Sequence, residues 1–310
     1  MPPWPHRPDA RAGRVRILDV TGVFGVIGAV AWRMRYDLLA VLAVAAAMAV
    51  LVDILPLQSA APVVPLLGIV VSIFIGFRNS NAFNRWWEAR TLWGTVVANC
   101  RALNNALVAV DDGSAPMAVT LDRMRRRQVR HAWQLAAELR GHQAPDAIRA
   151  LTPEDPPDAT AGNLLTLQAA DTRDMVQADM LDRQGRVILT NLNTAQAGAA
   201  GGLERVRNEP IPAYYTFFVR SLAWLVGILV CTRVDAGGHH SAQGIAIGVM
   251  IMALFVVAER MGHLAEEPLS DSAFALPMDR FCAGITADLL GTGHPLDTEP
   301  STTPDTPTRK

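Results

Sequence analysis

Four long apolar runs divide the chain, at residues 38–57, 54–77, 211–232 and 241–258. The first three runs reach or exceed the length of about 20 residues that a helix needs to cross the hydrocarbon core of a bilayer, and the fourth comes close to it. Prolines at 56, 62 and 65 interrupt the second run and predict a turn followed by a helix from about Val63. The pattern predicts an all-α integral membrane protein with four transmembrane helices, the first two forming a hairpin, and a helical cytosolic region.

The long segment between the second and third runs is polar but periodic. Apolar residues recur at helical spacing within residues 116–141, which predicts an amphipathic helix. Prolines within residues 153–157 predict a break, and a second helical region follows at about 161–208, with Gly201–Gly202 as its weak point. The arginines of Met124–Arg127 are interpreted as a solvated helix face rather than a patch for lipid or nucleic acid.

Arginine placement predicts the orientation of the spans. The N-terminal arm carries six arginines before residue 36, and four more follow the second run, whereas the connection at 58–62 carries none. Because positive residues gather on the cytoplasmic side, both termini and the middle segment are expected to face the cytoplasm. The expected organisation is a cytosolic N-terminal arm at 1–35, the hairpin at 36–78, a cytosolic helical region at 79–210, two further membrane helices at 211–261, a cytosolic C-terminal segment at 262–294 and a disordered tail at 295–310.

Charge and cysteine content exclude several functions. The formal net charge is −1, so the chain lacks the basic excess of a nucleic-acid binder. Cys100, Cys231 and Cys282 are odd in number and widely spaced, which indicates reduced packing residues rather than disulfides or a metal site. The sequence shows no catalytic triad, metal or phosphate-loop pattern, so neither an enzyme nor a cofactor is expected.

One apolar stripe stands out at the end of the second run. Ile69, Ile73 and Phe77 lie four residues apart on a helix, and Gly76 beside them would allow another helix to approach closely. A stripe of this kind can face either a core or a pore. The polar residues that follow it are Arg78, Asn79, Ser80, Asn81 and Asn84. A helix cap followed by an interfacial aromatic anchor at Trp86 and Trp87 also accounts for them, and periodicity alone favours that account.

Three ordered stretches carry a family resemblance. They are residues 75–80 (IGFRNS) continued by 85–94 (RWWEARTLWG), residues 204–212 (ERVRNEPIP) leading to Tyr215–Thr216, and residues 276–279 (LPMD). Together they resemble bestrophins, and the bacterial branch in particular. The resemblance implies a homopentamer in the lipid bilayer of a bacterial inner membrane, with one axial pore for small monovalent ions and a narrow neck lined by Ile69, Ile73 and Phe77. It also suggests Val206 for a second, cytosolic constriction.

The resemblance leaves the choice of ion open. Arg78, Asn79, Asn81 and Arg85 would lie at the pore mouth, and the excess of arginine there favours chloride or other small anions, as in animal bestrophins. A sodium channel of the same fold is the alternative, and a membrane-anchored scaffold or a transporter is the alternative of another class. Animal bestrophins hold calcium with an acidic cluster after the fourth span. Here residues 266–274 offer few carboxylates, and His239–His240 has only Asp235 close by, so no metal is expected.

Overall fold

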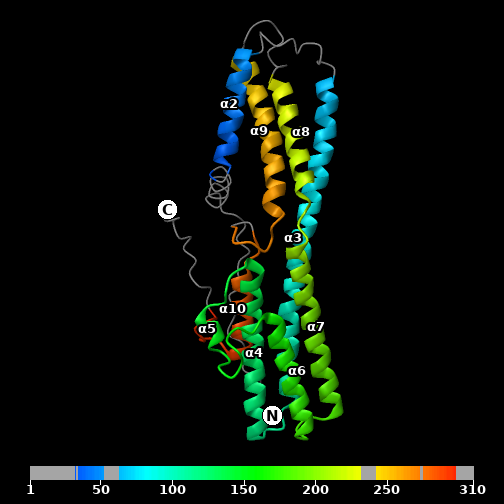
Figure 1. The fold of residues 1–310 in the computed structure, drawn as a ribbon, viewed down its shortest axis with the longest axis vertical. Helices are drawn as coiled ribbons and strands as arrows, with labels where there is room; N and C mark the ends of the chain where they lie inside the picture. Colours follow the sequence, from blue (N-terminus) through cyan, green and yellow to red (C-terminus); the bar gives the residue numbers. More distant parts are fainter. Residues whose placement is uncertain (1–31, 33, 52–62, 232–241, 273–274, 298–310) are drawn as a thin grey trace, which may run out of the picture. The chain divides into compact units, whose positions relative to one another are not determined.

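The computed structural model describes residue 32 and residues 34–51, 63–231, 242–272 and 275–297, and this part of the chain contains helices and no strand. The helices, shown in Figure 1, are α2 (Arg35–Leu51), α3 (Val63–Val110), α4 (Ala115–Arg140), α5 (Asp146–Arg149), α6 (Ala161–Gln177), α7 (Arg183–Asn208), α8 (Ala213–Cys231), α9 (Ala242–Ala265) and α10 (Met278–Leu290). Most of the expected N-terminal arm, the hairpin turn and most of the expected tail lie outside the described residues.

The chain forms two compact units. An apolar unit comprises Met1–Phe77 and Tyr214–Met261, and a polar unit comprises Arg78–Ala213 and Gly262–Lys310. Helix α3 belongs to both, because the boundary falls between Phe77 and Arg78 in its interior. The division therefore follows the change from apolar to polar sequence rather than the end of a helix.

The apolar unit packs α2, α8, α9 and the first part of α3 around two small cores. Val71 and Ile75 of α3 meet Val219, Ala223 and Val226 of α8 in one core, and the second joins α2, α8 and α9 around Val41, Met252 and Val256. A Cβ placed on Gly227 would lie 2.6 Å from Met252 Cγ, so glycine allows α8 to approach α9 this closely.

Two described helices, α3 and α9, are long and apolar enough to span a bilayer, and residues 214–230 of α8 form a shorter apolar stretch. The first apolar run coincides with α2 only as far as Leu51, since its remaining residues lie outside the described part. The sequence prediction of four transmembrane helices therefore stays a prediction, while the all-helical fold is confirmed.

Charged residues within the apolar unit pair with one another. Arg260 Nε lies 2.7 Å from an Asp37 carboxylate oxygen, and Arg220 lies 3.6 Å from Asp37 and 3.8 Å from Glu259. Asp37 is in α2, Arg220 in α8, and Glu259 and Arg260 in α9. Because unpaired charge is expensive in apolar surroundings, this cluster ties the three helices together.

Helix α3 continues far beyond the apolar run. It extends for 48 residues, from Val63 to Val110, so the helix cap predicted at Arg78–Asn84 is wrong. Buried residues recur at helical spacing in the polar half, at Ala82, two turns later at Ala89, and then every three or four positions at Trp93, Val96 and Cys100. Packing of this face against the polar unit maintains the helix through a sequence that looks like a boundary.

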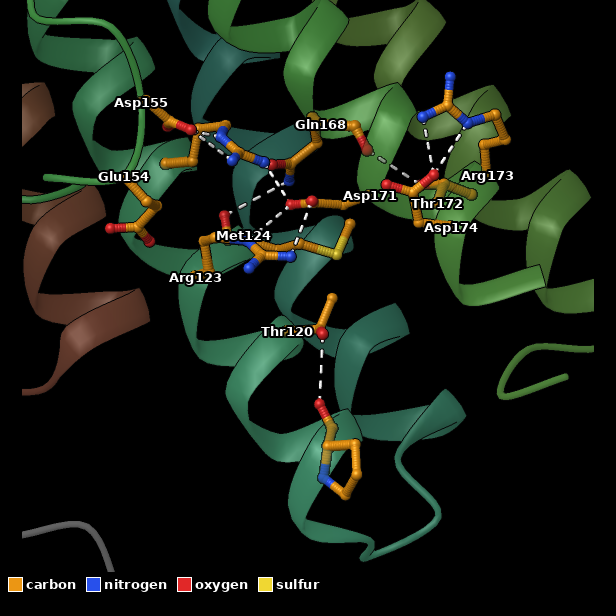
Figure 2. Close-up of polar contacts among 12 residues, drawn as sticks. Thr120, Arg123, Met124, Glu154, Asp155, Gln168, Asp171, Thr172, Arg173 and Asp174 are labelled. Atoms are coloured by element: carbon orange, nitrogen blue, oxygen red, sulfur yellow. Dashed lines mark hydrogen bonds and ion pairs between the residues drawn. The ribbon is translucent and has the colours of Figure 1, made fainter. Parts of the chain in front are cut away.

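The polar unit holds a buried ion-pair cluster on α4. Arg127 donates to both carboxylate oxygens of Asp155 at 2.7 and 2.6 Å and also pairs with Asp171 of α6, to which Arg123 adds two hydrogen bonds. Figure 2 shows Arg123, Asp155 and Asp171 drawn together by these contacts. The helix predicted at 116–141 is confirmed, but the solvated face predicted for its arginines is wrong for Arg127, whose side chain is only 4% exposed.

The helical region predicted at 161–208 breaks in an unexpected place. It divides between α6 and α7 at residues 178–182, where Asp179 has a positive φ of 56° and the Asp182 side chain caps α7 by accepting from the Gly185 N–H. Gly201–Gly202, the predicted weak point, lies inside α7. A Cβ on Gly202 would lie 2.8 Å from Leu92, so this glycine allows α7 to pack closely on α3.

Acid should destabilise the polar unit through His131. This α4 side chain is fully buried, its Nδ1 lies 2.9 Å from the Ala161 carbonyl oxygen, and burial lowers the pKa of the imidazole to about 4. The unfolded chain takes up this proton below about pH 6.5 and the folded chain only below about 4. Stability from this residue should therefore be complete above about pH 6.5 and fall toward pH 4, by an amount on the order of 3 kcal/mol.

Thermal unfolding of the full chain between pH 7 and 4.5, followed by tryptophan fluorescence, tests this expectation. His131→Asn keeps an N–H donor for the Ala161 carbonyl but removes the titrating ring, so its melting temperature should depend less on pH. The exposed His142 provides the control, since His142→Asn should keep the wild-type profile. An unchanged profile in His131→Asn would assign the acid sensitivity to other groups.

Candidate functional site

The stripe predicted at the end of the second apolar run is exposed in the isolated chain. Ile69, Ile73 and Phe77 are 59%, 52% and 64% exposed, and Leu66, one turn earlier, is 63% exposed. Their neighbours Val71 and Ile75 point to the other side and are buried against α8. The stripe is therefore not a core face of this chain, and it presents apolar surface to something other than the described residues.

Gly76 does not receive another helix within the chain. A Cβ placed on Gly76 would have no neighbouring atom within 4 Å, apart from its own helix. The close approach predicted at this glycine is therefore not made by the described residues. The space beside Gly76 continues the open face of the stripe.

Arg78, predicted to lie at a pore mouth, is fully buried in the polar unit. Its Nε donates to Glu266 Oε1 at 2.8 Å, and His263 Nδ1 lies 2.9 Å from the other oxygen of the same carboxylate. Burial raises the pKa of the Glu266 carboxyl, but the hydrogen bonds from His263 and Arg78 and the charge of Arg78 outweigh burial and hold that pKa below its ordinary value. The Arg78 charge is therefore neutralised inside the protein.

Arg85 is also committed to contacts within the polar unit. Its guanidinium donates to the backbone carbonyls of Glu266 at 2.9 Å, Glu209 at 2.5 Å and Val206. The arginine therefore joins α3 to the end of α7 and to the segment after α9. Satisfying three carbonyls from two separate segments is a positioning role, and it commits the guanidinium donors to backbone acceptors rather than to a passing ion.

The two asparagines of the predicted mouth differ in their placement. Asn81 is exposed, whereas Asn79 is half-buried beside Gly262, where an added Cβ would lie 2.0 Å from Asn79 Oδ1. Asn84, one turn beyond Asn81, is exposed as well. The polar surface that continues the stripe therefore consists of neutral amides rather than of Arg78 and Arg85.

Comparison with known proteins identifies the family. The sequence profile of the family described as Bacterial/Fungal Bestrophin protein matches residues 11–291. The chain belongs to this family. Its relatives include the voltage-dependent anion channel-forming protein YneE of Escherichia coli strain K12, which is 26% identical over 235 residues that cover 73% of this chain and 74% of the relative. A second is the voltage-dependent anion channel-forming protein mll4386 of Mesorhizobium japonicum, 28% identical over 229 residues that cover 70% of each chain.

Solved structures agree with this assignment. The crystal structure of a bacterial bestrophin homologue from Klebsiella pneumoniae superposes with a TM-score of 0.73 at 25% identity, covering 84% of this chain and 96% of the other. The resemblance to bestrophins drawn from the sequence is thus confirmed, and so is the bestrophin fold.

Val206 is poorly placed for the second constriction suggested for this bestrophin-family chain. Its side chain is 4% exposed and packs in the main core of the polar unit with Leu203 and Ala199 of the same helix. A side chain enclosed by its own subunit cannot line an axis shared with other copies. The structure therefore argues against Val206 as a pore-lining side chain. Its backbone carbonyl accepts a hydrogen bond from Arg85.

Sequence reasoning missed the ion pair between Glu88 and Arg205. Arg85 lies only three residues before Glu88 on the same helix, but the Glu88 carboxylate contacts Arg205 of α7 instead. Nothing local to Glu88 indicated a partner 117 residues away. Only the fold brings the two charges together.

Two of the three acidic residues in the stretch at 266–274 pair with basic side chains. Glu266 pairs with Arg78 and His263, and Asp271 lies 3.2 Å from Arg140 and 2.8 Å from His142. Within the described residues, no three His, Cys, Asp or Glu side chains gather as a metal site would require. The Glu266 and Asp271 carboxylates would each have to give up a basic partner of the protein in order to bind calcium.

Calcium at micromolar concentration should therefore neither activate nor stabilise the protein. A specific site at a hundredfold excess over its dissociation constant would add about 2.7 kcal/mol of stability. Thermal unfolding in calcium, in chelator and in an equal concentration of magnesium measures this difference. Equal melting temperatures are expected, and a rise seen with calcium but not with magnesium would contradict the prediction.

Proposed function

We propose that the protein is a subunit of a homopentameric bestrophin-type anion channel, with both termini in the cytoplasm of a bacterial inner membrane. The observation that carries this proposal is the exposed apolar stripe of Ile69, Ile73 and Phe77 on α3, whose opposite face is buried. Family membership and the names of the relatives support the assignment to channels rather than to enzymes.

Five copies of the stripe would form an apolar neck. Side chains at Ile69, Ile73 and Phe77 from each subunit would stack as three successive rings, about one helical turn apart. A narrow apolar tube loses its water easily, and an ion does not enter a dry tube. The neck would therefore act as a gate without carrying any charge.

Support for anions comes from the relatives and no longer from the arginines. The Arg78 charge is buried and paired with Glu266, and the Arg85 guanidinium donates to three carbonyls, so neither side chain is available to contact an ion at the pore mouth expected from the sequence. YneE and mll4386 are named voltage-dependent anion channel-forming proteins. A sodium channel of the same fold remains the alternative, because an apolar neck does not discriminate by sign.

A membrane scaffold or a transporter is the alternative of another class. The exposed stripe would then be a face for packing against a partner or a moving helix. Single-channel recording from the purified chain in a planar bilayer separates these functions, because only a channel gives unitary current steps.

Shortening the neck should increase the current. Ile73→Ala removes five side chains at once, so the ring widens and holds water, and unitary conductance or open probability should rise about twofold or more. Planar-bilayer recording of the purified variant measures both quantities.

Leu254→Ala is the matched control, because Leu254 is 67% exposed on α9 but lies outside the stripe. Its current should match that of the wild type. If Ile69→Ala, Ile73→Ala and Phe77→Ala all conduct as the wild type does, the stripe is a packing face and the pore lies elsewhere.

The ion preference should be modest and toward anions. In a sodium chloride gradient, the wild-type reversal potential is expected closer to the chloride than to the sodium equilibrium value. A reversal potential near the sodium equilibrium value would leave the channel function standing but would show that the permeant ion is a cation.

A further inference from the structure

Glu88 and Arg205 form an ion pair that remains in contact with solvent. The Glu88 carboxylate on α3 contacts the Arg205 guanidinium on α7, and the two side chains are 45% and 59% exposed. They differ in this respect from Arg78 and Glu266, whose side chains are only 0% and 9% exposed. A solvated pair of this kind adds little stability, so its contact with water is the property of interest.

Glu88 lies on the same face of α3 as the apolar stripe. It follows Phe77 by 11 residues, which is about three helical turns and returns it to within about 20° of the direction of Phe77. Asn81 and Asn84, between them on this face, are exposed. If the stripe lines the pore, the next charged side chain along that face is Glu88.

The contact with Arg205 follows from close packing between α3 and α7. Gly202 faces Leu92, Gln196 faces Cys100, and Arg205 faces Glu88, so the helices run antiparallel along the contact. The small Gly202 brings the backbones close enough for Arg205 to reach α3. The pair is therefore held by the fold and does not depend on a chance meeting of two long side chains.

We infer that the Glu88–Arg205 pair controls charge selectivity on the cytosolic side of the neck, an inference that rests on the proposed channel function. Five pairs around an axis would present five carboxylates and five guanidinium groups at one level. Their charges cancel, so a passing ion of either sign meets a weak field. Selectivity of the wild type is then modest because the ring is paired.

Removing either partner should shift selectivity in opposite directions. Glu88→Gln leaves five unpaired guanidinium groups and should raise the chloride-to-sodium permeability ratio about two- to fivefold, whereas Arg205→Gln leaves five carboxylates and should lower it by a similar factor. Both shifts should shrink at molar salt, because screening shortens the reach of each charge. Reversal potentials of the purified full-length variants in sodium chloride gradients give these ratios.

Two further variants separate charge from folding. Asp288→Asn breaks the exposed Arg101–Asp288 pair at 2.6 Å, which also involves α3 but lies about 120° around the helix from Phe77, and it should leave selectivity unchanged. The double variant Glu88→Arg with Arg205→Glu restores a neutral pair and should return the ratio toward the wild-type value.

The outcomes test the selectivity role of the Glu88–Arg205 pair separately from the proposed channel function. Opposite shifts in the two single variants, with recovery in the double variant, support the selectivity role. Unitary current with an unchanged ratio, or shifts in the same direction, would overturn that role and leave the channel intact. A wild-type protein without unitary current would overturn both.

Discussion

Helix α3 is one continuous helix that must be stable in two different surroundings, apolar in its first part and polar in its continuation. The packing of the other helices depends on this. Its first part buries Val71 and Ile75 against α8 in the apolar unit, and its continuation buries Trp93, Val96 and Cys100 in the main core of the polar unit. The residues on the opposite face stay exposed in both units. A helix with one face buried throughout and the other left open suits a subunit whose second face is completed by further copies.

Buried charge makes the change between these surroundings specific. Arg78 is the first residue of the polar unit and is fully enclosed, so its guanidinium needs the Glu266 carboxylate, and Glu266 in turn is held by His263. Replacing one member of such a pair leaves the other buried and uncompensated, which typically costs about 3 to 5 kcal/mol. The contact therefore fixes where the segment after α9 returns to α3, a register that apolar packing alone would leave less defined.

The sequence reveals patterns that repeat locally but not partners that lie far apart. Apolar runs and helical periodicity predicted α4, α8 and the helix beginning at Val63, and short motifs indicated the family. The continuation of α3 was visible in the spacing of Ala89, Trp93 and Val96, but the polar residues 78–84 resembled a boundary. The burial and the hydrogen-bond partners of Arg78 and Arg85 were not predictable. Their partners lie more than 120 residues away, and the assembled fold decides which side chains are buried. Val206 was misplaced for the same reason, since its motif gives its position along α7 and not the side it faces.

Gly262 and Asn79 carry a consequence for how this sequence can vary. With a Cβ at residue 262 only 2.0 Å from Asn79 Oδ1, the two positions share one small volume at the junction of α3 and α9. A larger residue at 262 needs a smaller one at 79, so substitution at either site alone is disfavoured. Among related chains the two positions should change together, as a coevolving pair that records this contact in sequence alone.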